Sequence, residues 1–104
     1  MTALLDSAEV LLADLVGFAS ISCLSNDDIV TYIKSYFESH GIEVHLDAHE
    51  DGERFNIFAS IGPVTDGGIL LSGHLDVVPA NPASWSRDPF VLHKENGRLY
   101  GRGA

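Results

Sequence analysis

The first apolar stripe of the chain has the 3.6-residue period of an amphipathic helix. It predicts a helix from about Ser7 to Phe18, with Asp6 or Ser7 as the cap. One face of this helix gathers its larger apolar residues: Val10, Leu11, Leu15 and Phe18. We expect this face to pack against the rest of the fold.

A second helix is predicted from Asp27 to His40. Ser25 or Asn26 is the candidate cap, and Gly41 is expected to end the helix in the left-handed conformation. The spacing of the apolar and aromatic residues is what burying one helical face requires, so they are assigned to the core rather than to a ligand-binding cluster: Ile29, Tyr32, Ile33, Tyr36 and Phe37.

Short apolar runs after the second helix predict three strands, Ile42–Leu46, Phe55–Ile61 and Gly68–Ser72. The third run is continuously apolar, as in an interior strand of a parallel or mixed sheet. The pattern therefore predicts an α/β fold in which two helices are followed by strands of a mixed sheet.

A hairpin is predicted near the end of the sequence. Phe90–Lys94 and Arg98–Tyr100 flank an Asn96-Gly97 pair, which is the signature of a type I′ turn. This hairpin would return the Gly101–Gly103 segment toward His74, where glycines allow a close backbone approach and Arg102 could anchor carboxylates or pair at the surface.

The candidate chemistry lies directly after the third predicted strand. His74 and Asp76 are two positions apart, so in extended backbone their side chains leave on the same face. That arrangement suits a metal ligand with a carboxylate that fixes its tautomer. The alternative is structural: His74 ends a strand and Asp76 opens a turn before Pro79.

Composition narrows the classes of partner. The 104 residues include 6 Lys and Arg against 15 Asp and Glu, a net charge of −9, which argues against nucleic acid or an anionic membrane as a partner. No run of about 20 apolar residues is present. The acidic run Asp47, Glu50, Asp51 and Glu53 is interpreted as a solvated loop rather than a cation site.

The remaining histidines and the cysteine have structural interpretations. His45 and His49 are expected to be solvated, His93 to occupy an exposed cross-strand position, and His40 to complement a helix end. Cys23 is interpreted as a packed loop thiol, and a single cysteine without a signal peptide fits the cytoplasm.

Three ordered motifs carry a family resemblance: SGHLDVVP from Ser72 to Pro79, then WSRDPF from Trp85 to Phe90, then NGRLYGRGA from Asn96 to Ala104. Together they resemble the amino-terminal part of the acetylornithine deacetylase and succinyl-diaminopimelate desuccinylase family of zinc hydrolases. Leu75 departs from that pattern, since threonine is common there in the deacetylases.

The resemblance implies specific roles and cofactors. His74 would be a ligand of one of two zinc ions, with cobalt as a possible substitute, and Asp76 would orient His74. Two zinc ions would polarise an amide carbonyl and activate a water, while a glutamate accepts the proton. The family also implies a small N-acyl amino acid substrate and a homodimer.

The resemblance further implies that residues 1–104 are a partial catalytic domain. In the family an aspartate that bridges the metals follows GRGA directly, so the chain is expected to be truncated and inactive by itself. The favoured reaction is deacetylation of N-acetylornithine in arginine biosynthesis, on the basis of the amino-terminal half. Alternatives are a desuccinylase, a carboxypeptidase or aminoacylase, and a non-catalytic fragment or interaction module.

Overall fold

The computed structural model describes residues 2–104, which divide into two compact units. One unit comprises Leu24–Leu75, and the other comprises the chain through Cys23 together with Asp76–Ala104. Each unit has its own helix and its own two-stranded antiparallel sheet, and each is described by itself.

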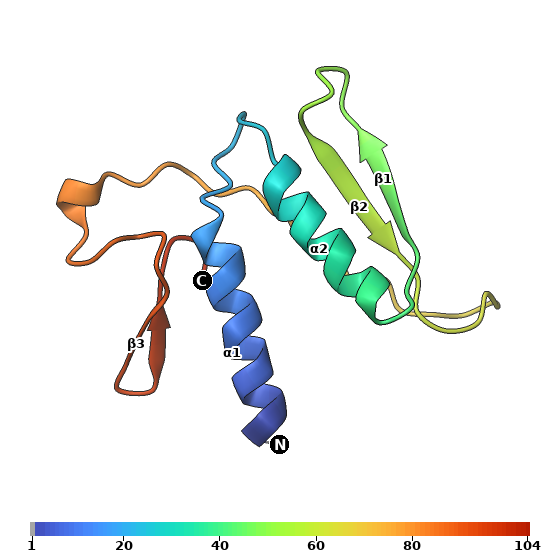
Figure 1. Ribbon diagram of the computed structural model, residues 1–104, viewed down its shortest axis with the longest axis horizontal. Helices are drawn as coiled ribbons and strands as arrows, with labels where there is room; N and C mark the ends of the chain where they lie inside the picture. The colour runs from blue at the N-terminus through green and yellow to red at the C-terminus, as the bar shows by residue number, and fades with distance from the viewer. Residues whose placement is uncertain (1) are drawn as a thin grey trace. The chain divides into compact units, whose positions relative to one another are not determined.

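In the Leu24–Leu75 unit, helix α2 (Asp27–Ser39) lies against a hairpin of β1 (Val44–Ala48) and β2 (Phe55–Ala59), as Figure 1 shows. The strands pair antiparallel, with Val44 opposite Ala59 and Ala48 opposite Phe55. Burial alternates along β2, as the period of two in a half-covered strand requires. The centre of this small core is Val30, which is 1% exposed.

The start of α2 differs from the expected cap. Asn26 is the residue before the helix, but its side chain makes no capping bond. Its Oδ1 instead accepts from the Phe55 backbone N–H at 2.9 Å, and its Nδ2 donates to the Phe55 carbonyl at 3.0 Å. Ser25 Oγ accepts weakly from the Asp27 N–H at 3.3 Å. Asn26 therefore ties the helix start to β2, while Gly41 does adopt the predicted positive φ, 73°.

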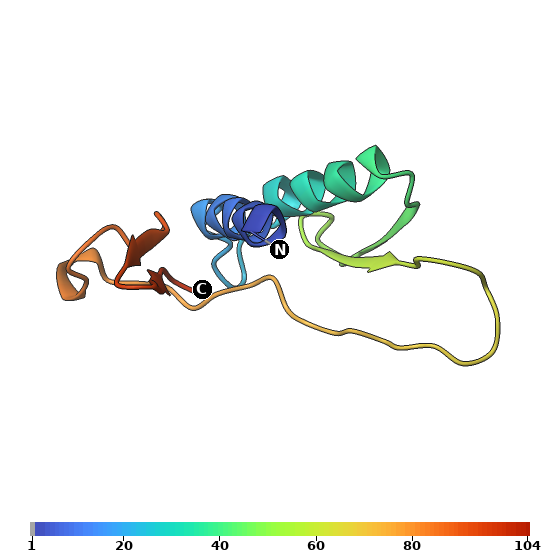
Figure 2. The same ribbon diagram turned by 90° about the horizontal axis from the view of Figure 1, so that it is seen from below.

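The third predicted strand is wrong. Residues 60–75 form no strand, and Figure 2 shows an extended trace without an arrow after β2. Ile69, Leu70 and Leu71 are 90%, 80% and 89% exposed. A continuously apolar strand needs neighbours on both edges and both faces, and the described residues pair with one another only as β1 with β2 and β3 with β4, apart from one isolated bridge. The single mixed sheet is therefore not formed by residues 2–104.

In the other unit, helix α1 spans Thr2–Gly17, five residues earlier at its start than predicted. Its buried residue is Val16, which is 6% exposed, whereas the expected stripe residue Val10 is 61% exposed. Leu15 and Phe18 are half-buried as expected. Among residues 2–104, no helix combines the length and apolar character needed to cross a membrane.

The predicted terminal hairpin is confirmed in a shorter form. Strand β3 (His93–Glu95) pairs antiparallel with β4 (Arg98–Tyr100), and a 3₁₀ turn, η1, spans Pro82–Ser84 before them. Asn96 and Gly97 have φ values of 51° and 74°. Positive φ at both central residues is what a type I′ turn requires, so this local signal was sufficient to place the turn.

Candidate functional site

Asp76 is held by the turn that follows α1. Ser22 Oγ donates a hydrogen bond of 2.6 Å to Asp76 Oδ2. The neighbouring backbone reinforces this contact: the Val77 N–H donates to the Ser20 carbonyl, and the Ser22 N–H donates to the Val77 carbonyl, both at 2.9 Å. These bonds form an isolated parallel bridge between Ile21 and Val77. Asp76 thus begins a segment whose backbone is fixed by residues more than 50 positions earlier.

His74 belongs to the Leu24–Leu75 unit and lies in its extended final segment, where its side chain is exposed. The structure therefore places the predicted ligand in solvent-accessible backbone that carries no secondary structure. The roles assigned to His74 and Asp76 stay predictions.

The glycine segment after the terminal hairpin approaches Val77. A Cβ added to Gly103 would lie 2.6 Å from Val77 Cγ1, and Gly103 has a φ of 84°. Only glycine meets both conditions without rearrangement. Gly101 has a different neighbour, because its Cβ would lie 3.0 Å from Val16 Cγ1. Gly101 thus serves the packing of α1.

Arg102, between these glycines, stacks on an aromatic ring. Its guanidinium carbon lies 5.1 Å from the centroid of the Trp85 ring, within the range of a cation–π contact. Its backbone N–H donates to the Pro89 carbonyl at 2.7 Å. The Arg102 side chain therefore joins the GRG segment to the WSRDPF motif, which neither of its two expected roles described.

A zinc site needs about three or four protein ligands. Among residues 2–104, no group of three or more His, Cys, Asp or Glu side chains is arranged to hold a metal ion. The described residues consequently do not form a metal site by themselves.

The other histidines make local contacts. His40 Nδ1 lies 2.9 Å from the Tyr36 carbonyl, at the end of α2, as its predicted helix-end role implies. His45 and His49 are exposed, as expected. His93 is a correction: its side chain is only 25% exposed, and its ring stacks on Tyr100, the residue opposite it in the hairpin.

Cys23 is also a correction, because its thiol is exposed rather than packed. Cys23 has a φ of 71° and follows the Ile21–Val77 bridge.

The acidic loop is solvated, as predicted, and Asp51 organises it. Asp51 Oδ1 accepts from the Glu53 N–H at 2.9 Å, and Oδ2 accepts from Arg54 Nε at 2.8 Å. The Glu53 backbone N–H, followed by the side chain of Arg54, holds the pKa of Asp51 well below its ordinary value of 3.8. The acidic cluster is thus a hairpin tip closed by hydrogen bonds.

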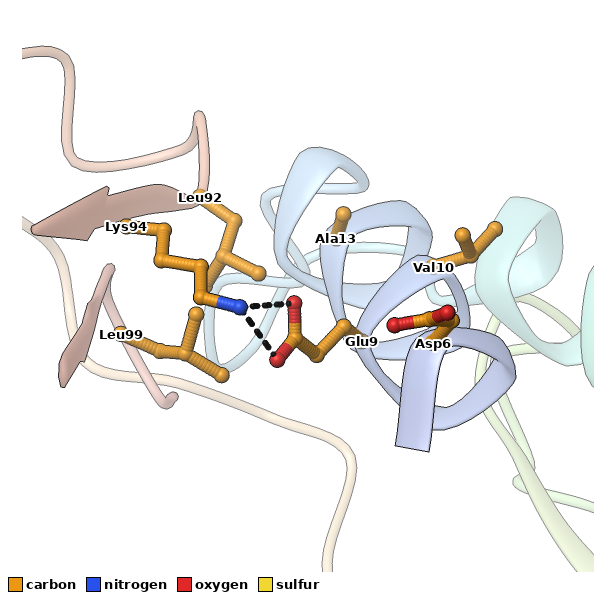
Figure 3. Close-up of a pocket in the computed structure, with 7 residues that line it drawn as sticks. All are labelled: Asp6, Glu9, Val10, Ala13, Leu92, Lys94 and Leu99. Atoms are coloured by element: carbon orange, nitrogen blue, oxygen red, sulfur yellow. Dashed lines mark hydrogen bonds and ion pairs between the residues drawn. The ribbon is translucent and has the colours of Figure 1, made fainter. Parts of the chain in front are cut away.

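An open pocket of about 330 Å³ lies between α1 and the terminal hairpin. Figure 3 shows Lys94 pointing at Glu9 across it, with Nζ 2.8 and 2.9 Å from the two carboxylate oxygens. The hydrogen bond and charge of Glu9 raise the pKa of Lys94. Lys94 and Glu9 neutralise each other's charge as an ion pair. This pocket therefore contains an ion pair beside apolar side chains.

The sequence pattern alone does not single out Ser22 as a partner of Asp76. Ser22 and Asp76 are 54 positions apart, and a single sequence contains no signal that pairs them. The only local hint is the serine-rich stretch Ser20–Ser25 itself.

Comparison with known proteins adds the identity of the motif-bearing region. Residues 70–104 match the model of peptidase family M20/M25/M40. Over 80 residues the chain is 41% identical to the acetylornithine deacetylase of Shigella sonnei (strain Ss046), covering 76% of this chain and 21% of that enzyme. The chain thus spans about a fifth of the length of this relative. These two matches show that residues 70–104 are similar to the M20/M25/M40 peptidase family and that the chain is similar to an acetylornithine deacetylase over 80 residues.

Proposed function

We propose that this chain contributes His74 and Asp76 to the metal centre of a zinc-dependent amide hydrolase, and that residues 1–104 are part of its catalytic domain. The observation that carries the proposal is that both residues fall within residues 70–104, the segment that matches a family of metal-dependent hydrolases.

The two side chains suit these roles by their chemistry. A neutral imidazole binds zinc through one ring nitrogen, and a carboxylate that accepts from the other N–H fixes the tautomer and raises the basicity of the ligand. Asp76 has such a carboxylate, and Ser22 already engages one of its oxygens. Because no group of three ligands occurs among residues 2–104, the proposal requires further ligands from elsewhere in the assembled enzyme.

The proposed reaction is hydrolysis of the acetamide of N-acetylornithine to ornithine and acetate. The 41% identity to a protein named acetylornithine deacetylase supports this substrate over a succinylated or peptide substrate. We further propose that the intact enzyme is a cytoplasmic homodimer. The chain by itself is expected to show no turnover.

Complementation tests the proposal. The chain is mixed with a variant of the Shigella sonnei acetylornithine deacetylase that lacks the 80 matched residues, and release of acetate or succinate from the respective substrate is followed with zinc present. Turnover of N-acetylornithine is expected only in the mixture and should exceed turnover of N-succinyl-diaminopimelate. Faster release from the succinylated substrate would reassign the substrate, and association without turnover of either would contradict the catalytic proposal.

One observation favours a second candidate, a non-catalytic interaction module. The extended segment exposes Val64 at 99%, Ile69 at 90% and Leu71 at 89%. Unpaired apolar backbone of this kind is a template for strand pairing. The second candidate predicts that the chain associates with the enzyme variant that lacks the 80 matched residues but that the mixture shows no turnover. The same mixture therefore distinguishes the two candidate functions.

A further inference from the structure

We infer that Arg102, stacked on Trp85, is the binding residue of a carboxylate site. Both residues belong to the unit that comprises the chain through Cys23 together with Asp76–Ala104. The contacts that support the site all lie within that unit, and none involves the metal centre proposed above.

The guanidinium of Arg102 is held in place before any ligand binds. Its central carbon lies 5.1 Å from the centroid of the Trp85 ring. The backbone N–H of Arg102 donates to the Pro89 carbonyl at 2.7 Å, and the next residue, Gly103, packs on Val77. A side chain that is already ordered loses less conformational entropy on binding than a free one does.

The N–H donors of this guanidinium have no acceptor in the part of the chain that the structure describes. Among residues 2–104 the Arg102 side chain forms no hydrogen bond and no ion pair, and its Nε is shielded from solvent without a partner. The Trp85 ring cannot supply one, because indole is a donor only. A shielded donor without an acceptor calls for an explanation, and a missing ligand is one.

The two Nη atoms are the part of the guanidinium that a ligand can reach. They are not shielded in the way that Nε is. A ligand that accepts from them neutralises a charge that no carboxylate of residues 2–104 pairs with. Binding should therefore stabilise this unit.

The sequence around the site has a charge balance opposite to that of the rest of the chain. The segment Asp76–Ala104 contains four of the six basic residues and only three of the 15 acidic ones, whereas residues 1–75 contain two basic and twelve acidic residues. The four basic residues are Arg87, Lys94, Arg98 and Arg102. Lys94 is already paired with Glu9. The three arginines thus make this segment the part of an acidic chain that attracts an anion.

A carboxylate fits the guanidinium better than other common anions do. Its two oxygens accept parallel hydrogen bonds from the planar fork of N–H donors. Chloride has no direction of acceptance that the fork could match. A phosphate group carries further charged oxygens, which a single fork leaves unpaired. We therefore expect the site to bind acetate in preference to chloride and phosphate.

Acetate is the probe, and Trp85, the single tryptophan, reports its binding by fluorescence. The chain is titrated at neutral pH with sodium acetate in place of sodium chloride, so that the ionic strength stays constant. Arg102→Gln, Arg102→Lys and Arg98→Gln are titrated in the same way. Arg98→Gln is the matched control, because Arg98 is an exposed arginine of the same hairpin and its replacement removes the same charge.

We expect saturation in the millimolar range for the unaltered chain and for Arg98→Gln. The affinity should fall about tenfold or more in Arg102→Gln, which loses the charged donors. It should also fall in Arg102→Lys, which keeps the charge without the fork. Equal affinities of Arg102→Gln and Arg98→Gln would overturn the site, and tighter binding of phosphate than of acetate would overturn its assignment to a carboxylate.

A capped tripeptide with a central glutamate distinguishes two sources of the carboxylate. Tighter binding of the peptide than of acetate assigns the ligand to a polypeptide, and tighter binding of acetate assigns it to a small molecule. Either result supports the site, whereas the absence of binding by both refutes it.

A measurement on the unaltered chain covers the case in which replacement of Arg102 unfolds its unit. The guanidinium N–H signals of Arg102 in NMR spectra should shift with acetate, with the same midpoint as the fluorescence. The urea midpoint of this unit should rise over the same range of acetate concentration. Guanidinium signals that stay unchanged while the fluorescence changes would place the acetate elsewhere and contradict the role of Arg102.

Discussion

Gly103 and Val77 approach each other so closely that one methyl group on Gly103 would come within 2.6 Å of Val77 Cγ1. This contact joins the GRGA segment to the residue directly after Asp76. Gly103→Ala should destabilise its unit by about 1–3 kcal/mol for overpacking, in addition to about 1–2 kcal/mol for a side chain at positive φ. Urea unfolding followed by the fluorescence of Trp85, the single tryptophan, measures the loss in this unit.

Gly67→Ala is the control for backbone strain, because Gly67 has a φ of 79° with nothing within 4 Å of an added Cβ. Gly67→Ala should therefore incur only the cost of a side chain at positive φ, about 1–2 kcal/mol. Val77→Ala combined with Gly103→Ala should recover part of the loss, since residues in contact are not additive. Equal costs for Gly67→Ala and Gly103→Ala, each measured in its own unit, would refute the close approach.

The core of the other unit depends on Val30, which is 1% exposed. Val30→Ala removes two methyl groups from a filled site and should cost about 1–3 kcal/mol. Val64→Ala makes the same chemical change at a 99% exposed position and should cost no more than about 0.5 kcal/mol. Amide exchange at Ile57 in β2 reports the difference, and similar protection in both variants would contradict this core.

Asn26 is expected to matter more than a helix cap would. Asn26→Ala removes both hydrogen bonds to the Phe55 backbone and should cost about 1–3 kcal/mol. Asn26→Ser, a good capping residue that is too short to reach both groups, should recover little. Full recovery of the urea midpoint by serine would show that capping, rather than the tie to β2, is the role of this side chain.

The hairpin tip should respond to acid through Asp51. Its pKa is lower in the folded chain than its ordinary value of 3.8, chiefly because the carboxylate accepts from the Glu53 N–H. A group of this kind contributes stability above its unfolded pKa, and that contribution falls as pH drops below about 4 toward the folded pKa. The difference in urea midpoint between the unaltered chain and Asp51→Asn should therefore be largest near neutral pH and shrink below pH 4.

Glu50→Gln, a change at the neighbouring exposed position, provides the control for loss of one negative charge from the loop. It should leave the dependence on pH unchanged. An equal response of Glu50→Gln and Asp51→Asn would assign the effect to the total charge of the loop instead of to the bonds of Asp51.

Elements with local signals were predictable from the sequence. Asp27–Ser39 follows the apolar period of one helical face, and Asn96-Gly97 demands a particular turn. The strand predicted at Gly68–Ser72 failed because strand formation depends on partners elsewhere in space, and an apolar run specifies the need for burial without supplying it.

The candidate site likewise contains residues with a local sequence signal and residues whose role depends on a distant partner. His74 and Asp76 could be proposed because they are close in the sequence and sit in a recognisable motif. Ser22 could not, because its relationship to Asp76 exists only after the turn behind α1 meets Val77. Asn26 was misassigned for a similar reason: its partner at Phe55 lies 29 positions away, and a capping role is the default for asparagine before a helix.

The central claim is that His74 is a metal ligand, and zinc content tests it most directly. This chain is assembled with the Shigella sonnei enzyme variant that lacks the 80 matched residues, and the assembly is purified. Zinc ions per assembly are then measured with the unaltered chain, with His74→Ala and with His45→Ala. His45 is an exposed histidine on β1 with no proposed role. The account predicts two zinc ions with the unaltered chain and with His45→Ala, and a loss of zinc with His74→Ala. The same zinc content in all three assemblies would contradict it.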